Sequence, residues 1–261
     1  TDSGNVTGIN ASGDSQVAWN WLAGTAFSND ASATGVGTID SSGQVNTTAG
    51  FSIVSYTGNS STDGQTVAHG LSSAPEMVII KNRSNARNWR TYHSALGATK
   101  YINLDETAAA ATYGSFNDTA PTSTVFSTTD SDADRATNYN SDNYIAYCFH
   151  SVEGYSKVGS FVGNGNADGP FVYTGFRPAF VIVKNTTGTE SWGMGDSTRS
   201  SFNTLKDRLY PNLSNAEYST GDWLDLVSNG FKHRGTAFNT SGATYIYLAF
   251  AESPFKFANA R

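Results

Sequence analysis

The sequence predicts an all-β protein of two tandem, duplicated β-sandwich modules of jelly-roll-like form, preceded by an extended N-terminal arm. Two observations predict this fold: one pattern occurs twice, and short runs of β-branched and aromatic residues alternate with clusters of Gly, Asn, Asp, Ser and Pro. We expect the arm or linker at residues 1–50, the first module at 51–157 and the second at 158–261.

The repeat joins two stretches of the last two hundred residues. Each copy contains an aromatic residue, a Gly-Asn pair, a Pro, an apolar run, a Lys-Asn pair and a Trp. Six residues separate Pro from Lys and eight separate Lys from Trp in both copies, at Pro75, Lys81 and Trp89 and at Pro178, Lys184 and Trp192. Solenoid repeats have periods of about 20–50 residues, whereas this repeat has the size of a small domain. It therefore predicts a duplicated module whose halves pack through a pseudo-twofold.

The first fifty residues are rich in small polar residues, apart from one apolar cluster at 17–22. Trp19 and Trp21 alternate within it, so on extended chain they point to the same side. We expect an arm that docks on the first module or on a neighbouring subunit, or else the last strand of a preceding domain. Residues 28–50 are expected to form turns with at most one weak strand. The chain begins at Thr1, and we expect it to be a fragment or a processed product.

Strands are expected at seven places along the two modules, at 51–56, 77–82, 144–149, 159–162, 171–174, 180–184 and 244–250. The runs at 77–80 and 180–183 are apolar without alternation, which is typical of strands covered on both faces. Residues 107–112 and 200–209 have weak helical patterns and are expected to form short helices in the connections.

The composition favours a weakly charged, polar surface. Only 15% of the residues are charged, against about 25% in typical soluble domains. The net charge is −6 without any basic run, so nucleic acid is excluded as an expected partner. No apolar stretch approaches the length of about 20 residues that spans a bilayer, so membrane insertion is not expected. Cys148 is the only cysteine, which excludes an intrachain disulfide and is typical of a small buried apolar residue.

Four stretches carry a resemblance to a known family, at 46–54, 142–149, 159–179 and 249–256. Together they resemble an uncharacterised domain near the C-terminus of structural proteins of marine bacteriophages, notably cyanophages, and the likeness covers 17–261. The resemblance implies a virion component at the particle surface, such as a fibre, tail or capsid-appended protein with an adhesive role. It implies other virion proteins as partners and a homo-oligomer, for which fibres in general suggest a trimer. It supplies no catalytic residues.

Two loops have partial calcium-binding patterns. Residues 164–169 alternate oxygen-bearing side chains before a Gly, but Gly175 stands where a calcium loop has its bidentate acid. Asp130, Asp132 and Asp134 also alternate, with Arg135 where the loop needs Gly. A hairpin turn and a solvated loop explain these patterns better, so we expect no metal and no cofactor.

Two patches are candidates for binding a host surface glycan, because sugar binding needs exposed aromatic rings beside polar groups. One is Trp223 with Asp222 and Asp225, and the other is Tyr92 with Arg90 and His93. For Trp223 the alternative is local packing within a strand.

The leading hypothesis is a non-enzymatic bacteriophage structural protein with an adhesive role. The first alternative is a carbohydrate-binding receptor-recognition module. The second is a glycan depolymerase, whose pair of carboxylates the sequence does not identify. In each case we expect a binding site in the loops where the two copies differ.

Overall fold

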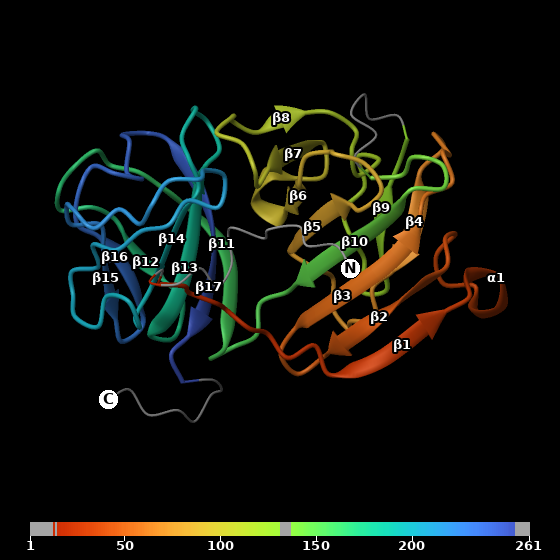
Figure 1. Ribbon diagram of the computed structural model, residues 1–261, viewed down its shortest axis with the longest axis horizontal. Coiled ribbons are helices and arrows are strands. Elements are labelled where there is room, and N and C mark those ends of the chain that lie inside the picture. The colour runs from red at the N-terminus through yellow and green to blue at the C-terminus, as the bar shows by residue number, and fades with distance from the viewer. Residues whose placement is uncertain (1–12, 14, 131–136, 254–261) are drawn as a thin grey trace.

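The computed structural model describes residues 13, 15–130 and 137–253, and these form an all-β protein built from antiparallel sheets (Figure 1). Over the described residues it has seventeen strands, one short α-helix, α1 (Ala31–Thr34), and one 3-10 turn at Ser94–Leu96. No helix in these ranges is long and apolar enough to cross a membrane.

The first central sheet has eight strands in the order β1-β2-β3-β10-β5-β6-β7-β8. Their bounds are, in that order, Thr25–Asn29, Ser41–Asn46, Phe51–Thr57, Asn143–Phe149, Met77–Asn82, Arg90–His93, Lys100–Asn103 and Ala111–Thr112. A small outer sheet of β4 (Gln65–Ala68) and β9 (Val125–Thr128) covers one of its faces.

The second central sheet has four strands in the order β11-β17-β13-β14. Their bounds are Ser156–Val162, Thr244–Ala251, Pro178–Asn185 and Gly193–Asp196. Its outer face is covered by a three-stranded sheet in the order β12-β16-β15, namely Phe171–Tyr173, Gly230–His233 and Leu224–Val227. All seven expected strands are confirmed, with ends that differ by up to three residues.

Both central sheets bury both faces, because successive side chains of a strand point to opposite sides. In β5, Val78 and Ile80 face the outer sheet, whereas Met77 and Ile79 face the other half of the molecule. The strands β13 and β17 alternate in the same way. The result is four stacked sheets with three apolar layers between them. We call the middle layer, which joins the two central sheets, the seam; its core includes Phe51, Met77, Phe149, Phe180, Leu248 and Phe250.

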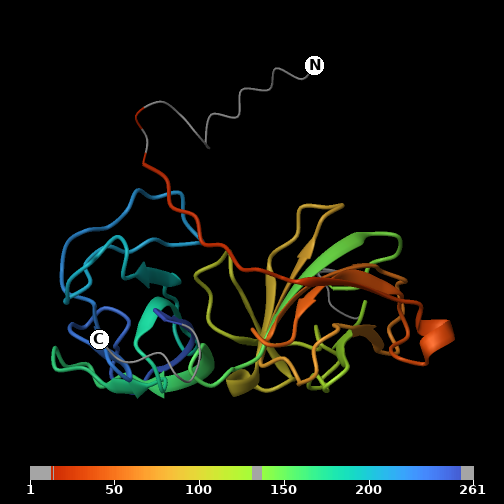
Figure 2. The ribbon, with the colours of Figure 1, turned by 90° about the horizontal axis from the view of Figure 1, so that it is seen from below.

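Residues 15–24 form an extended arm that lies across both halves of the molecule (Figure 2). The indole of Trp21 contacts four rings of the seam, with centroid distances of 6.4 Å to Phe51, 6.4 Å to Phe149, 6.0 Å to Phe180 and 5.3 Å to Phe250. Trp19 lies 5.3 Å from Phe180. Trp19 and Trp21 therefore share one side of the chain as expected, and they dock on both halves rather than on the first alone.

The expected arm is too long, because Thr25–Asn46 belongs to the first central sheet. β1 pairs with β2, and β2 pairs with β3. Between them, the Asp30 side chain accepts hydrogen bonds from the first turn of α1, and Gly35 ends the helix at a φ of 68°.

Both helices expected in the connections are wrong. Residues 107–112 contain β8 instead. In 200–209, Leu205 is buried and bridges to Leu224, and Leu209 bridges to Met194. Tertiary pairing overrides the weak helical spacing there.

The Trp21→Ala variant tests how far the arm stabilises the seam. We expect its free energy of unfolding to fall by about 2 kcal/mol, less than for a fully buried tryptophan, because the ring is half-buried. Urea denaturation measures the change. The matched control is Leu22→Ala, whose side chain is 80% exposed and should change stability by less than about 0.5 kcal/mol. Equal stability of the two variants would contradict the role of the arm.

Candidate functional site

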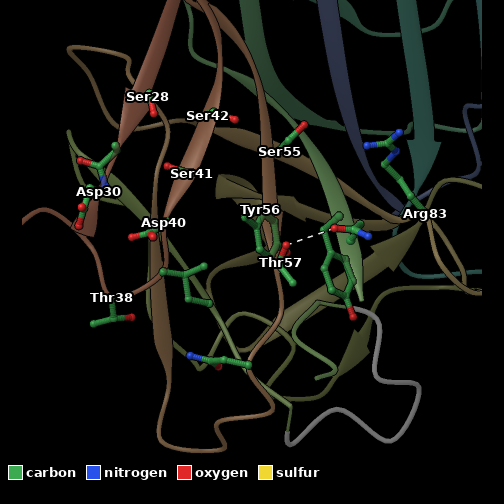
Figure 3. Close-up of a pocket in the computed structure, with 15 residues that line it drawn as sticks. Ser28, Asp30, Thr38, Asp40, Ser41, Ser42, Ser55, Tyr56, Thr57 and Arg83 are labelled. Atoms are coloured by element: carbon green, nitrogen blue, oxygen red, sulfur yellow. Dashed lines mark hydrogen bonds between the residues drawn. The ribbon is translucent and has the colours of Figure 1, made fainter. Parts of the chain in front are cut away.

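A polar groove of about 630 Å³ opens at the end of the first central sheet that carries β1 (Figure 3). Its walls come from β1, β2, β3 and the start of β10, together with Asp30, residues 38–40, Asn59 and Arg83 from the connections. Most of it is therefore built by the segment 28–57, which the sequence alone did not single out.

A row of serine hydroxyls crosses the groove. Ser28 is the cross-strand partner of Ser42, and Ser42 is the partner of Ser55, so the three side chains lie on one face of three neighbouring strands. Strands are spaced about 4.8 Å apart, which sets the spacing of the row. Thr57 continues the same face, and its hydroxyl donates to Asn143 Oδ1 at 3.2 Å, as the dashed line in Figure 3 marks. The row offers several neutral donors and acceptors side by side.

The two carboxylates of the groove anchor the start of α1. Asp30 Oδ1 accepts from Ser32 Oγ at 2.6 Å and from Ala33 N at 3.1 Å. Donation by the Ser32 hydroxyl, followed by the Ala33 amide, lowers the pKa of Asp30 below its usual value. Asp40 Oδ1 accepts from Ala31 N at 2.8 Å. Both acids thus have a structural role in the turn.

Two stacked tyrosines form the buried wall of the groove. The rings of Tyr56 and Tyr144 lie 5.0 Å apart at an interplanar angle of 12°. Burial raises the pKa of Tyr56 well above 10 and that of Tyr144 to about 12. The Tyr56 hydroxyl donates to the carbonyl of Thr137 at 2.6 Å. Both phenols are therefore neutral at physiological pH and hold the wall rigidly.

The hydroxyl row of the groove can form hydrogen bonds with a polar ligand. A glycosidase needs a general acid whose pKa is raised so that it carries a proton at neutral pH. Asp30 has the opposite shift, because its carboxylate accepts hydrogen bonds. Over the described ranges, no group of three His, Cys, Asp or Glu side chains is arranged to hold a metal ion.

A family model described as a domain of unknown function, DUF7483, matches residues 1–254. The chain belongs to this family. No curated protein and no solved structure matches it.

In this DUF7483 domain, the candidate patch around Trp223 is mostly buried. Trp223 is 0% exposed and packs against Phe238, with ring centroids 5.6 Å apart. The local packing that was its alternative is therefore what the structure shows. Asp225 is buried beside Arg234, at 2.5 Å between Oδ2 and Nε. Asp222 is exposed and lies 3.7 Å from the ammonium of Lys206.

The second patch is buried as well. Tyr92 lies in the core of the first half, with its ring centroid 5.5 Å from that of Phe116. His93 is 0% exposed, and its Nδ1 accepts from Ala95 N at 3.1 Å. This leaves Nε2 to donate to the carbonyl of Tyr247 at 3.4 Å, so His93 links the two halves. Neither candidate patch forms an exposed aromatic platform.

The loop 164–169 is a turn held by its own side chains. Asn164 Nδ2 donates to the carbonyl of Asp168 at 3.0 Å, and Asn166 N donates to Asn164 Oδ1 at 3.0 Å. The Asp168 carboxylate lies 2.9 Å from the ammonium of Lys232. The second calcium-like pattern, Asp130 to Asp134, continues from Asp130 into 131–136, which lies outside the described residues.

Sequence reasoning missed two exposed aromatics, Phe171 and Tyr173, which are 48% and 66% exposed. They alternate with the buried Val172 in an expected strand. The alternation of side chains along the strand could have revealed them, because one face of an outer sheet points to solvent and every second residue lies on that face.

Buried histidines make stability depend on pH. Burial lowers the pKa of His93 and His69 to about 4 and that of His233 to about 3, from 6.5. The unfolded chain therefore binds these protons first, and acid favours unfolding. We expect the free energy of unfolding to fall between about pH 6.5 and 4, by up to about 1.4 kcal/mol per pH unit for each histidine.

Urea denaturation at a series of pH values measures this slope. In His93→Gln the slope should fall by about a third, since one of three such groups is removed. An unchanged slope in this variant would contradict the assignment.

Proposed function

We propose that this DUF7483 domain is a non-enzymatic structural component of a bacteriophage particle, displayed on a fibre, tail or capsid appendage with an adhesive role. The observation that carries the proposal is the seam, which fuses two β-rich halves into one body with few charges. Such a body suits display on a particle. The resemblance of 46–54, 142–149, 159–179 and 249–256 to marine phage structural proteins supports the virion setting.

The proposal includes a tandem duplication of one β-sandwich module. Four strands in each half have the same order and direction: β3-β10-β5-β6 corresponds to β11-β17-β13-β14. A stacked pair of aromatic rings joins the same two strands in each half. Tyr56 and Tyr144 lie 5.0 Å apart at 12°, and Phe161 and Tyr245 lie 5.1 Å apart at 9°.

A buried asparagine clamp also occurs in both halves. Asn138 Oδ1 accepts from Asn59 N at 3.0 Å, and its amide donates to Asn59 Oδ1 at 3.0 Å. Asn239 Oδ1 accepts from Asn164 N at 2.8 Å, and its amide donates to Asn164 Oδ1 at 3.0 Å. The repeated groups are thus packing and turn groups, which favours a scaffold over a single catalytic centre.

Other virion proteins and further copies of this chain, in a trimer by analogy with fibres, are the proposed partners. The first alternative remains a carbohydrate-binding receptor-recognition module, favoured by the hydroxyl row of the groove. The second, a glycan depolymerase, has less support because Asp30 and Asp40 both anchor α1.

The clamp gives a test of the duplication. We expect Asn138→Ala and Asn239→Ala each to lower the free energy of unfolding by about 2 kcal/mol, because each leaves buried backbone groups without their partner. Urea denaturation should show similar losses for both. Asn140→Ala is the control, because its side chain is exposed. A large loss in only one of the two clamp variants would contradict equivalent roles.

Immunogold labelling of phage particles with an antibody against this domain tests the virion proposal. We expect label at a capsid, tail or fibre position, on intact particles. Particles that carry the gene and fail to label would overturn the proposal. Release of reducing sugar from host envelope, abolished in an Asp30→Asn or Asp40→Asn variant, would support the depolymerase instead.

A further inference from the structure

The outer face of the sheet β12-β16-β15 carries a pair of exposed aromatic rings. Phe171 and Tyr173 are 48% and 66% exposed, whereas Val172 between them is 6% exposed and packs into the core. Residues two apart on a strand share a face and lie about 7 Å apart along it. Since β12 is an edge strand of this sheet, the rings stand at its rim.

Both rings lie against glycine backbone. Gly230 is the cross-strand partner of Tyr173, and a Cβ placed on Gly230 would lie 3.0 Å from Cε2 of Phe171. A Cβ placed on Gly175 would lie 3.7 Å from the Tyr173 hydroxyl. Because neither glycine has a side chain, each ring approaches the main chain closely with one side and exposes the other side to solvent. The pair therefore forms a platform.

Charged side chains border this platform and neutralise one another. Lys232 is the cross-strand partner of Phe171, and Asp225 is the next residue in the same row. Asp168 lies 2.9 Å from Lys232 Nζ and 3.7 Å from Arg234 Nη1. Arg234 Nε donates to Asp225 at 2.5 Å. Hydrogen bonding and charge from Lys232 lower the pKa of Asp168, so it stays ionised at neutral pH.

We infer that this face, the platform of Phe171 and Tyr173 with its border of Asp168, Asp225, Lys232 and Arg234, binds a neutral saccharide chain. A sugar ring has an apolar C–H face and a rim of hydroxyls. The two aromatic rings match the apolar faces of neighbouring sugar units. Fixed carboxylate, ammonium and guanidinium groups match the hydroxyls through charge-assisted hydrogen bonds.

The charge balance decides which saccharide fits. Two cations, Lys232 and Arg234, face two carboxylates, Asp168 and Asp225. The border thus has no net charge, and neither an anionic nor a cationic polymer would gain from it. Asp168 is 82% exposed at its side chain, so a bound hydroxyl can reach it without displacing the pairs.

The platform is distinct from the groove of Figure 3. The groove lies on β1 to β3, whereas β12, β15 and β16 lie at the opposite end of the molecule (Figure 1). The inference rests on the proposed adhesive function, because it names the class of ligand on the host surface.

The test uses the whole chain and an array of maltohexaose, cellohexaose, chitohexaose and neutral bacterial O-polysaccharides, followed by calorimetry on each binder. We expect saturable binding to at least one of them. In the Phe171→Ala/Tyr173→Ala double variant, Kd should rise at least tenfold, and in Tyr173→Phe it should change less than threefold because the ring remains. Phe202→Ala is the control, since Phe202 is an aromatic that is 85% exposed elsewhere.

Thermal unfolding should be unchanged in all variants, because the replaced side chains are exposed. Absence of binding to every saccharide, or equal binding by the double variant, would overturn the inference. Sedimentation of the wild type and the double variant tests whether this face is instead an interface between copies of the chain. An oligomer that forms in the wild type and is lost in the double variant would show such an interface and would also overturn the inference. Immunogold labelling tests the virion proposal separately, because the labelling does not depend on the platform.

Discussion

The seam is the constraint on which the rest of the structure depends. If each central sheet were covered only by its own outer sheet, its other face would be an exposed apolar surface. That surface would include Phe149 in the first half and Phe250 in the second. Exposed apolar faces of this kind are unfavourable in water, and packing them together removes both. The ring centroids of Phe149 and Phe250 lie 6.1 Å apart. The halves therefore stabilise one another, and Trp21 closes the edge of their contact.

This arrangement limits where function can lie. Most of the inner faces of both central sheets are covered by packing in the seam. An apolar cavity of about 390 Å³ does lie beneath Trp19 and Trp21, but its walls are those of the seam. The polar groove and the aromatic platform both lie away from the seam.

Much of the fold could be predicted from the sequence because its signals are local. Continuous apolar runs such as 77–80 and 180–183 identify strands buried on both faces. β2 was expected only as one weak strand without bounds in 28–50, because Ser41–Asn46 has polar, weakly β-forming residues and pairing with β3 decides its structure. Gly43 is required there by a close approach: a Cβ would lie 1.9 Å from the carbonyl oxygen of Ile53. Such a contact depends on the neighbouring strand, which spacing in sequence does not reveal.

The candidate site was harder to predict, because exposure depends on which face of an element meets a second layer. Trp223 follows an acid and resembles a sugar-binding residue in sequence, yet it lies beneath Arg208, whose guanidinium carbon is 5.7 Å from its ring. Phe171 resembles a core residue and is exposed, because β12 turns only Val172 inward.

A difference between the two proposed copies favours β12 as the strand of the proposed binding face. Val67 and Val172 each stand three residues before a glycine with positive φ, Gly70 at 74° and Gly175 at 89°. Both valines are buried. The flanking positions differ: Thr66, which is partly buried, and Ala68, which is buried, in the first copy correspond to the exposed Phe171 and Tyr173 in the second. Packing fixes the valines, whereas nothing in the fold requires two exposed aromatics. Their presence in one copy alone is what a binding role, rather than a structural one, would produce.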